Sequence, residues 1–362
     1  MTITNIRNGG NQMRKKYYDI NPILQTNSVY HVILGERSNG KSYAVKKCVI
    51  DDFLKKGLQF FYLRRYGEDV KSASVQRYFA DFNAYIKKCA NGDFDEVYCY
   101  SQYIYLRNSE TGEKVLAGYY SDLGSYERLK SQQFPDVYNF IFEEFITDKR
   151  YINGDGEPDL LMNILSTVLR NRKGRIFLIG NTVSQICPYF IEWGIDVKHM
   201  KQGTIQLIDY EGVQIAVEYC ESVENTNNFI IGGKKTAIME GKWEVTAYPK
   251  LLKPMSEYDV VWRIGFDMLG FKYVLELLVV KEFDSLLVYV YPFDRLENPY
   301  TIDRWISDKF SEDPQVTQGF RRESVLDMRI AALINRKKIC FSDNQTGTNF
   351  YQILRFLKVS VY

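Results

Sequence analysis

The sequence lacks the cysteine pairs and the histidines from which most structural metal centres are built. It has six Cys without a C-x-x-C pair and only two His, so a structural zinc site is not expected. Scattered Cys in a chain of 362 residues are typical of a reducing compartment. No run of about 18 apolar residues is present, and the N-terminal stretch has no apolar core, so neither a membrane span nor a signal peptide is predicted.

The sequence also lacks a strong excess of charge of one sign. Its 47 Lys and Arg stand against 45 Asp and Glu, which gives a formal net charge of +2. Any contact with nucleic acid must therefore come from a local basic patch rather than from the field of the whole chain. The apolar content is sufficient for packed cores, and the length predicts two or three domains at about 150 residues each.

A glycine-containing segment between two apolar stretches is the first positive signal. Residues 29–34 predict a strand, and the segment that follows fits the Walker A pattern G-x-x-x-x-G-K-[ST]. This segment consists of Gly35, Glu36, Arg37, Ser38, Asn39, Gly40, Lys41 and Ser42. Glycines let successive N–H groups converge on phosphate oxygens, and the following helix turns its positive end to the same anion. Lys41 would contact the β and γ phosphates, and Ser42 would offer a hydroxyl to Mg²⁺.

The flanking segments predict a βαβ unit around this loop. Apolar residues from Val45 to Leu54 recur with helical spacing, and Lys55, Lys56 and Gly57 end that helix. Residues 59–66 then predict a second strand. The alternative is a chance match in a surface turn, which such flanks disfavour. We therefore expect ATP to bind at residues 35–42.

A later buried strand ends in two acids, which is typical of a Walker B motif. Residues 137–142 are mostly apolar and lead into Glu143 and Glu144. Glu143 would hold Mg²⁺, and Glu144 would polarise the attacking water as a general base. The first acid of such strands is usually Asp, so the division of labour between the two glutamates stays open. A buried strand that merely ends in acids is the alternative.

Two polar positions follow this strand along the chain. Residues 158–174 predict a helix whose basic end includes Arg170, and residues 175–181 predict a third buried strand that ends in Asn181. Asn181 would sense the γ-phosphate. Arg170 has two interpretations, a favourable cation at a helix C-terminus or an arginine finger that enters the site of a neighbouring subunit.

Taken in order, these segments resemble the DNA-packaging ATPases of small tailed phages, the phi-29-type encapsidation proteins. Those proteins are ring ATPases of the additional-strand, catalytic-glutamate P-loop class. The resemblance rests on "GERSNGKSYAVK", "GLQFFYLRRY", "FIFEEF", "LSTVLRNR", "GNTVSQICPYF" and "FSDNQ". It implies an α/β fold with a RecA-like ATPase domain on a mostly parallel sheet.

The expected domain organisation has three parts. Residues 1–200 would form the ATPase domain, and the polar residues 201–245 would form a linker or lid. The resemblance implies that residues 246–362 form an RNase H-like α/β domain without nuclease activity. Asp267, Asp284 and Asp343 are candidates for a retained nuclease role, but no recognisable pattern surrounds them.

The resemblance also implies roles for individual residues. The implied set comprises Lys41 and Ser42 for nucleotide and Mg²⁺, Glu143 as the Walker B acid, Glu144 as the catalytic glutamate, Arg170 as the trans-acting finger and Asn181 on the sensor strand. Arg37 matches an arginine in the family's phosphate loop. It would switch between phosphate and the catalytic glutamate, or it is a solvent-facing loop charge.

The function that this resemblance implies is ATP-driven translocation of double-stranded DNA into a viral procapsid. The implied partners are duplex DNA, the portal of the procapsid, further copies of the chain in a ring such as a pentamer, and a structural packaging RNA in some relatives. The implied location is the host cytoplasm, transiently at the portal vertex, and not the mature virion. Two alternatives remain: a helicase-like or recombination P-loop motor, and a nucleotide-dependent assembly scaffold with negligible turnover.

Grip on duplex DNA without sequence preference should use phosphate contacts. Lys149 and Arg150, after the Walker B strand, are the first candidates, and Lys234 and Lys235 are the second. The alternative for each is a solvated loop charge.

Overall fold

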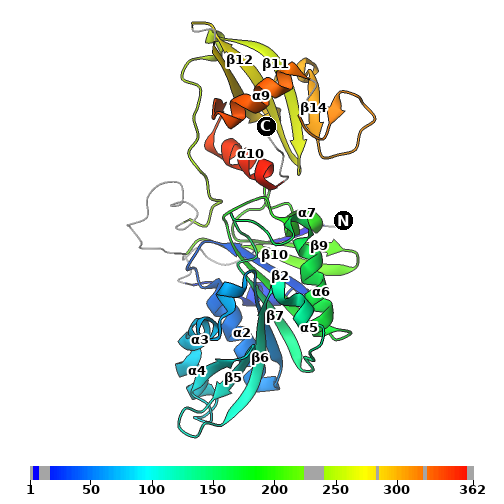
Figure 1. Cartoon of the computed structure of the whole chain (residues 1–362). Coiled ribbons are helices and arrows are strands. Elements are labelled where there is room, and N and C mark those ends of the chain that lie inside the picture. The colour runs from blue at the N-terminus through cyan, green and yellow to red at the C-terminus, as the bar shows by residue number, and fades with distance from the viewer. Residues whose placement is uncertain (1–2, 8–16, 224–239, 283–284, 321–323, 357–362) are drawn as a thin grey trace. The chain divides into compact units, whose positions relative to one another are not determined.

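The computed structural model describes residues 3–7, 17–223, 240–282, 285–320 and 324–356 (Figure 1). Within these ranges the chain forms two compact units, one that ends at Trp243 and one that begins at Glu244. Each unit is built on its own mixed sheet. None of the helices in the described ranges is long and apolar enough to cross a bilayer.

The first unit is organised by a ten-stranded sheet whose six central strands run parallel. Its strands are β1 (Ile3–Arg7), β2 (Tyr30–Gly35), β3 (Gln59–Arg64), β4 (Glu96–Tyr100), β5 (Tyr103–Arg107), β6 (Lys114–Asp122), β7 (Val137–Glu143), β8 (Arg175–Asn181), β9 (Thr204–Tyr210) and β10 (Val213–Tyr219). Their order across the sheet is β1-β9-β10-β2-β8-β7-β3-β6-β5-β4, and the outer pairs at both ends are antiparallel.

Helices cover both faces of this sheet, as buried parallel strands require. They are α1 (Asn21–Leu24), α2 (Lys41–Lys56), α3 (Ser72–Phe79), α4 (Asn83–Cys89), α5 (Tyr126–Leu129), α6 (Glu157–Leu169) and α7 (Pro188–Glu192). Along β7 the side chains alternate, because Ile141 belongs to the core cluster that includes Val45 of α2, whereas Phe142 packs against Tyr189 of α7. Helices α2, α3 and α4 thus lie on one face, and α6 and α7 lie on the other (Figure 1).

Helix α2 starts and stops at glycines in the left-handed conformation. Gly40 has φ 97° and Gly57 has φ 69°, and the N–H of Gly57 donates to the carbonyl of Phe53 at 2.8 Å. Residues that carry a side chain rarely adopt such φ values, so these two glycines fix both ends of the helix. The predicted βαβ unit is present as β2, α2 and β3.

Strand β8 lies between β2 and β7, which makes it the additional strand of the expected P-loop class. The predicted fold class of the first unit, an α/β domain on a mostly parallel sheet, is confirmed. Because β2, β8, β7 and β3 are parallel, their C-terminal ends lie along one edge, where α/β proteins bind ligands. That edge brings together the ends of the strands at Gly35, Arg64, Glu143 and Asn181.

Of the residues 201–245 expected to form a linker or lid, the structure corrects the expectation for residues 204–219, and residues 224–239 lie outside the described residues. Strands β9 and β10 pair with each other, and β10 extends the parallel part of the main sheet by pairing with β2. Ile208 and Val217 are fully buried within these strands. The alternation of apolar residues along β9 and β10 therefore predicts their structure better than the mean polarity of the segment does.

The second unit is built on a six-stranded sheet with the order β15-β14-β11-β12-β13-β16. Its strands are β11 (Tyr258–Met268), β12 (Phe271–Val280), β13 (Ser285–Pro292), β14 (Arg304–Ser307), β15 (Val316–Thr317) and β16 (Ile339–Phe341), and its helices are α9 (Val325–Asn335) and α10 (Asn344–Phe356). Strands β11, β12 and β13 are antiparallel, whereas β14 runs parallel to β11 and β16 runs parallel to β13. This unit has the mixed α/β architecture predicted for the C-terminal part of the chain.

Close pairing of β6 with β3 depends on a glycine. Gly118 is paired with Phe60, and a Cβ at Gly118 would lie 2.3 Å from the carbonyl oxygen of Phe60. We expect Gly118→Ala to lower the free energy of unfolding by about 1–3 kcal/mol, because the backbone must shift. Urea unfolding followed by circular dichroism measures the change. Gly67→Ala is the control, since its methyl group meets nothing closer than 3.5 Å; equal stability of the two variants contradicts the prediction.

Candidate nucleotide-binding and catalytic site

The phosphate loop, residues 35–42, connects β2 to α2 at the C-terminal edge of the parallel strands. Gly40 requires its glycine for the left-handed φ, and a Cβ on Gly35 would come within 3.0 Å of the Asn39 side chain. The N–H of Tyr18 donates to the carbonyl of Asn39 at 2.8 Å and holds the loop from outside. The loop is therefore compact at the start of a helix, the arrangement that cradles phosphates.

Lys41 is buried inside this loop. Its ammonium donates to the carbonyl of Glu36 at 2.5 Å and lies 3.2 Å from Asn39 Oδ1 and 3.4 Å from Asn181 Oδ1. Burial lowers the pKa of Lys41. All three acceptors are neutral oxygens, and a charged phosphate oxygen is a stronger acceptor for an ammonium. The Lys41 ammonium and the Asn181 side chain are therefore close enough for both to contact the same bound phosphate group.

Although Glu36 belongs to the phosphate loop, its carboxylate bonds to residues outside that loop. Its carboxylate accepts from the N–H of Val223 at 2.7 Å and from Ser222 Oγ at 2.8 Å. These contacts tie the phosphate loop to the chain just beyond β10. Among the expected nucleotide-binding residues, Glu36 can therefore contribute its backbone to a phosphate, while its side chain supports the loop.

Ser42 and Glu143 meet across the sheet edge. Ser42 Oγ donates to Glu143 Oε1 at 2.5 Å, and the hydroxyl of Tyr78 on α3 donates to Glu143 Oε2 at 2.6 Å. Glu143 is only 6% exposed, and burial raises the pKa of its carboxyl group. Tyr78 was not predicted, because nothing in its local sequence marks an aromatic residue on a separate helix as a partner of the Walker B strand.

The donor set at this point fits Mg²⁺, which the P-loop fold implies. Mg²⁺ binds oxygen ligands and is commonly held by one or two carboxylates, water and substrate phosphates. The Ser42 hydroxyl and the Glu143 carboxylate provide such oxygens side by side. A cation there would also oppose the effect of burial on Glu143, since an opposite charge favours the ionised carboxylate.

Glu144 lies in a different environment from its neighbour in sequence. Its side chain is 54% exposed, and its carboxylate accepts from the guanidinium of Arg64 at 2.6 Å. Its φ of 56° is unusual for a residue other than glycine. The chain thus turns sharply after β7, so Glu144 points along the edge of the sheet and not into the core beside Glu143.

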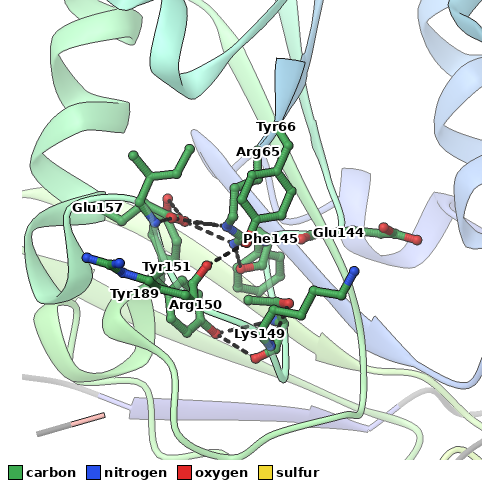
Figure 2. Close-up of polar contacts among 11 residues, drawn as sticks. Arg65, Tyr66, Glu144, Phe145, Lys149, Arg150, Tyr151, Glu157 and Tyr189 are labelled. Atoms are coloured by element: carbon green, nitrogen blue, oxygen red, sulfur yellow. Dashed lines mark hydrogen bonds and ion pairs between the residues drawn. The ribbon is translucent and has the colours of Figure 1, made fainter. Parts of the chain in front are cut away.

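Directly behind Glu144 lies a buried ion pair (Figure 2). Arg65 Nε is 3.0 Å from both carboxylate oxygens of Glu157, and both side chains are almost fully buried. Arg65 also donates to the carbonyls of Glu144 at 2.9 Å and Phe145 at 2.5 Å. Glu157 was missed from the sequence, since an acid in the first turn of a helix is ordinarily explained by the helix dipole.

The same pair holds the far end of the loop after β7. Glu157 accepts from the N–H of Ile152 at 2.7 Å, and the hydroxyl of Tyr66 donates to the carbonyl of Arg150 at 2.5 Å. Lys149 and Arg150 are exposed within this loop. Their role in DNA binding stays a prediction, and Lys234 and Lys235 lie outside the described residues.

Two adjoining cavities lie over this edge of the sheet. One has a volume of about 390 Å³ and is lined by the phosphate loop from Arg37 onward, and the other has a volume of about 620 Å³ and extends over the loop after β7. Arg37, Glu143, Glu144 and Asn181 line both. The structure therefore brings these predicted site residues together with Lys41 and Ser42.

Among the predicted catalytic residues, Arg170 does not line either cavity. It is exposed after α6, and its guanidinium lies 3.5 Å from the carbonyl of Gln132, which precedes β7. Glu143 ends that strand. Because β7 has seven residues, the two ends are about 20 Å apart. Arg170 therefore lies away from the cavities of its own chain, and its role as a finger stays a prediction.

The carboxylates considered for a nuclease site have other partners. Asp267 lies 3.4 Å from the ammonium groups of Lys272 and Lys309, and Asp343 forms an ion pair with Arg295 at 3.1 Å. Asp284 lies outside the described residues. In the portion of the chain that the structure covers, no group of three or more acidic, His or Cys side chains could hold a metal ion.

The amino-acid sequence is similar to those of phage DNA packaging proteins. The sequence pattern of the podovirus DNA encapsidation protein (Gp16) family matches residues 13–242. A DNA packaging protein of Bacillus phage B103 is 33% identical over 180 residues, which cover 48% of this chain and 50% of the relative. A DNA packaging protein of Bacillus phage phi29 is 32% identical over 177 residues, which cover 48% and 49%. The match thus spans about half the length of each relative.

The fold agrees over a longer region. A solved chain from the bacteriophage Phi-29 viral genome packaging motor assembly has a TM-score of 0.56 and 23% sequence identity, covering 96% of this chain and 100% of that chain. At that identity the match concerns the fold. The family pattern covers most of the first unit, including the phosphate loop, both glutamates and Arg170. The chain belongs to the podovirus DNA encapsidation protein (Gp16) family.

Proposed function

We propose that this protein is an ATPase that drives double-stranded DNA into a viral procapsid. The observation that carries the proposal is the juxtaposition of Ser42 and Glu143 at 2.5 Å beneath a phosphate loop, with Glu144 next in the chain at the same cavities. Family membership and the names of the relatives, which are DNA packaging proteins, support the proposal that this chemistry serves DNA packaging.

Binding of ATP is assigned to the loop and to Lys41. The backbone N–H groups of residues 35–42 would contact the phosphates, and Lys41 would exchange its neutral acceptors for oxygens of the β and γ phosphates. Ser42 and Glu143 would hold Mg²⁺, which when bound neutralises charge on the phosphates. Asn181, 3.4 Å from the Lys41 ammonium, would contact the γ-phosphate from the neighbouring strand.

Hydrolysis is assigned to Glu144. Its carboxylate would orient a water molecule and take its proton as the water oxygen bonds to the γ-phosphorus. The bond from that phosphorus to the β–γ bridging oxygen breaks, which yields ADP and inorganic phosphate. Arg64 holds Glu144 at 2.6 Å, so this ion pair must loosen before Glu144 can reach the water. Arg37 lines both cavities, so it is suited to contact phosphate once the ion pair of Arg64 and Glu144 has loosened.

Completion of the site is assigned to a second copy of the chain. Since Arg170 is exposed and lies at the opposite end of β7, its guanidinium would enter the cavity of a neighbouring subunit in a ring. There it would stabilise charge that develops on the transferred phosphoryl group. The finger is compatible with a pentamer and with other ring sizes.

The remaining partners follow from the same proposal. Lys149 and Arg150 would contact duplex phosphates, and their loop is tied through Glu157 and Arg65 to the proposed general base, Glu144. The portal of the procapsid and a structural packaging RNA are the proposed docking partners. The protein would act in the host cytoplasm, transiently at the portal vertex, and would be absent from the mature virion.

Two variants separate nucleotide binding from hydrolysis. We expect Lys41→Ala to weaken ATP binding by roughly tenfold or more, because a charged hydrogen-bond donor to phosphate is lost. We expect Glu144→Gln to bind ATP normally and to lower kcat by about a hundredfold or more, because the general base is removed. Binding is measured with a fluorescent ATP analogue, and turnover is measured by phosphate release.

The matched control for these variants is Glu127→Gln, which removes an exposed carboxylate on α5. It should bind and hydrolyse ATP like the wild type. Wild-type turnover in either Lys41→Ala or Glu144→Gln rules out the assigned site.

A mixing experiment tests the role of Arg170 in trans. We expect Arg170→Ala to bind ATP and to lose hydrolysis by about a thousandfold, as for other arginine fingers. Mixed rings with Glu144→Gln subunits should regain activity, because Glu144→Gln supplies the finger and Arg170→Ala supplies the intact base. Lys173→Ala, also exposed after α6, is the control with normal turnover. Absence of any recovery at every mixing ratio contradicts a trans role.

A packaging assay tests the function as a whole. Purified protein, procapsids, genomic duplex and ATP should yield DNA that is protected from added nuclease, and Glu144→Gln should yield none. ATP turnover that rises with single-stranded but not with duplex DNA indicates a helicase-like motor. ATP binding without DNA-stimulated turnover indicates an assembly scaffold, and either result rejects the proposed function.

A further inference from the structure

The Walker B glutamate is held by two hydroxyl groups, one on each carboxylate oxygen. Ser42 Oγ occupies Oε1 at 2.5 Å, and Tyr78 occupies Oε2 at 2.6 Å. Glu143 is 6% exposed, so water has little access to replace either bond. The two bonds together fix both the position and the plane of the carboxylate.

Tyr78 is itself held in place from two sides. Its ring stacks on Tyr62 of β3, with ring centroids 4.9 Å apart and an interplanar angle of 27°. The ammonium of Lys46, one turn beyond Ser42 on α2, lies 4.3 Å from the ring centroid and donates to the carbonyl of Tyr78 at 2.6 Å. Lys46 is anchored in turn by Asp81 at 2.9 Å. A side chain locked in this way can orient its partner.

The identity of the Walker B acid explains why such a support is useful. Glutamate has one methylene and one torsion angle more than aspartate, so its carboxylate has more orientations to lose when it binds a cation. One hydrogen bond, from Ser42, leaves rotation of the carboxylate about its last torsion. A second bond from Tyr78 to the other oxygen removes that freedom before the ligand arrives, which lowers the entropic cost of binding.

We infer that Tyr78 is a positioning residue that presents the Glu143 carboxylate to the metal ion of the bound nucleotide. The inference rests on the proposed function, since it concerns the Mg²⁺ that accompanies ATP. Tyr78 makes no contact with nucleotide in this scheme and acts through Glu143. Partners that orient metal ligands commonly change metal affinity by tenfold to a hundredfold when they are removed.

The test measures metal binding directly. Mn²⁺ replaces Mg²⁺, and electron paramagnetic resonance gives the dissociation constant of Mn²⁺ from the complex with ADP. Tyr78→Phe should raise that constant by about tenfold, while the affinity for ADP in the absence of metal stays unchanged. Tyr120→Phe is the control, because Tyr120 is a buried tyrosine of β6 that does not bond to Glu143. Its hydroxyl instead bonds to Ser72 on α3, the helix that carries Tyr78.

A double-mutant cycle separates positioning from a general effect on the fold. Glu143→Asp should itself bind Mn²⁺ about tenfold more weakly, because the shorter side chain cannot keep both hydroxyl partners. Adding Tyr78→Phe to Glu143→Asp should then change the constant by less than about twofold. Thermal unfolding of each variant is recorded, and Glu143→Asp, which keeps Tyr78, provides the test if Tyr78→Phe does not fold.

The possible results distinguish failure of the role inferred for Tyr78 from failure of the proposed function. Wild-type Mn²⁺ affinity in Tyr78→Phe or in Glu143→Asp, or full additivity of the two substitutions, overturns the role of Tyr78. Failure of the wild-type protein to bind ADP and Mn²⁺ at all rejects the proposed function instead.

Discussion

The contact between Ser42 and Glu143 is the interaction on which the site depends. It joins a residue in the first turn of α2 to the residue that ends β7, although β8 lies between β2 and β7. Neighbouring strands are about 4.8 Å apart, so the two chain segments face each other over about 10 Å. Parallel strands that end at one edge, together with the Ser42 and Glu143 side chains that reach toward each other, bring the two oxygens to 2.5 Å. The sheet order therefore decides the chemistry.

Two adjacent glutamates acquire different properties at this edge. Glu143 is still part of β7 and is buried, which raises the pKa of its carboxyl group and suits it to a partner with positive charge. Glu144 is beyond the strand, half exposed and paired with Arg64. The turn at Glu144, with φ 56°, is what separates them. This change of backbone direction supports the proposed division of labour between the two glutamates, which the sequence left open.

The predictable parts of the molecule are those whose cause is local. The phosphate loop, the apolar strand before Glu143 and the polar end of β8 at Asn181 each have a residue pattern that their own conformation requires. Tyr78 and Glu157 could not be predicted, because their importance comes from partners at residues 143 and 65, far along the chain. The linker expectation failed at residues 204–219 for a related reason, since pairing of β10 with β2 is a tertiary contact.

The buried pair of Arg65 and Glu157 supports two neighbouring segments, the turn at Glu144 and the loop that follows it. Main-chain groups that are turned away from water need hydrogen-bond partners. Arg65 supplies donors to the carbonyls of Glu144 and Phe145, and Glu157 supplies an acceptor to the N–H of Ile152. Apolar side chains could fill the same volume but could not satisfy these groups. The position of Glu144 and the shape of the loop with Lys149 and Arg150 are therefore set by the same two side chains, and a displacement of that loop must strain the contacts behind Glu144.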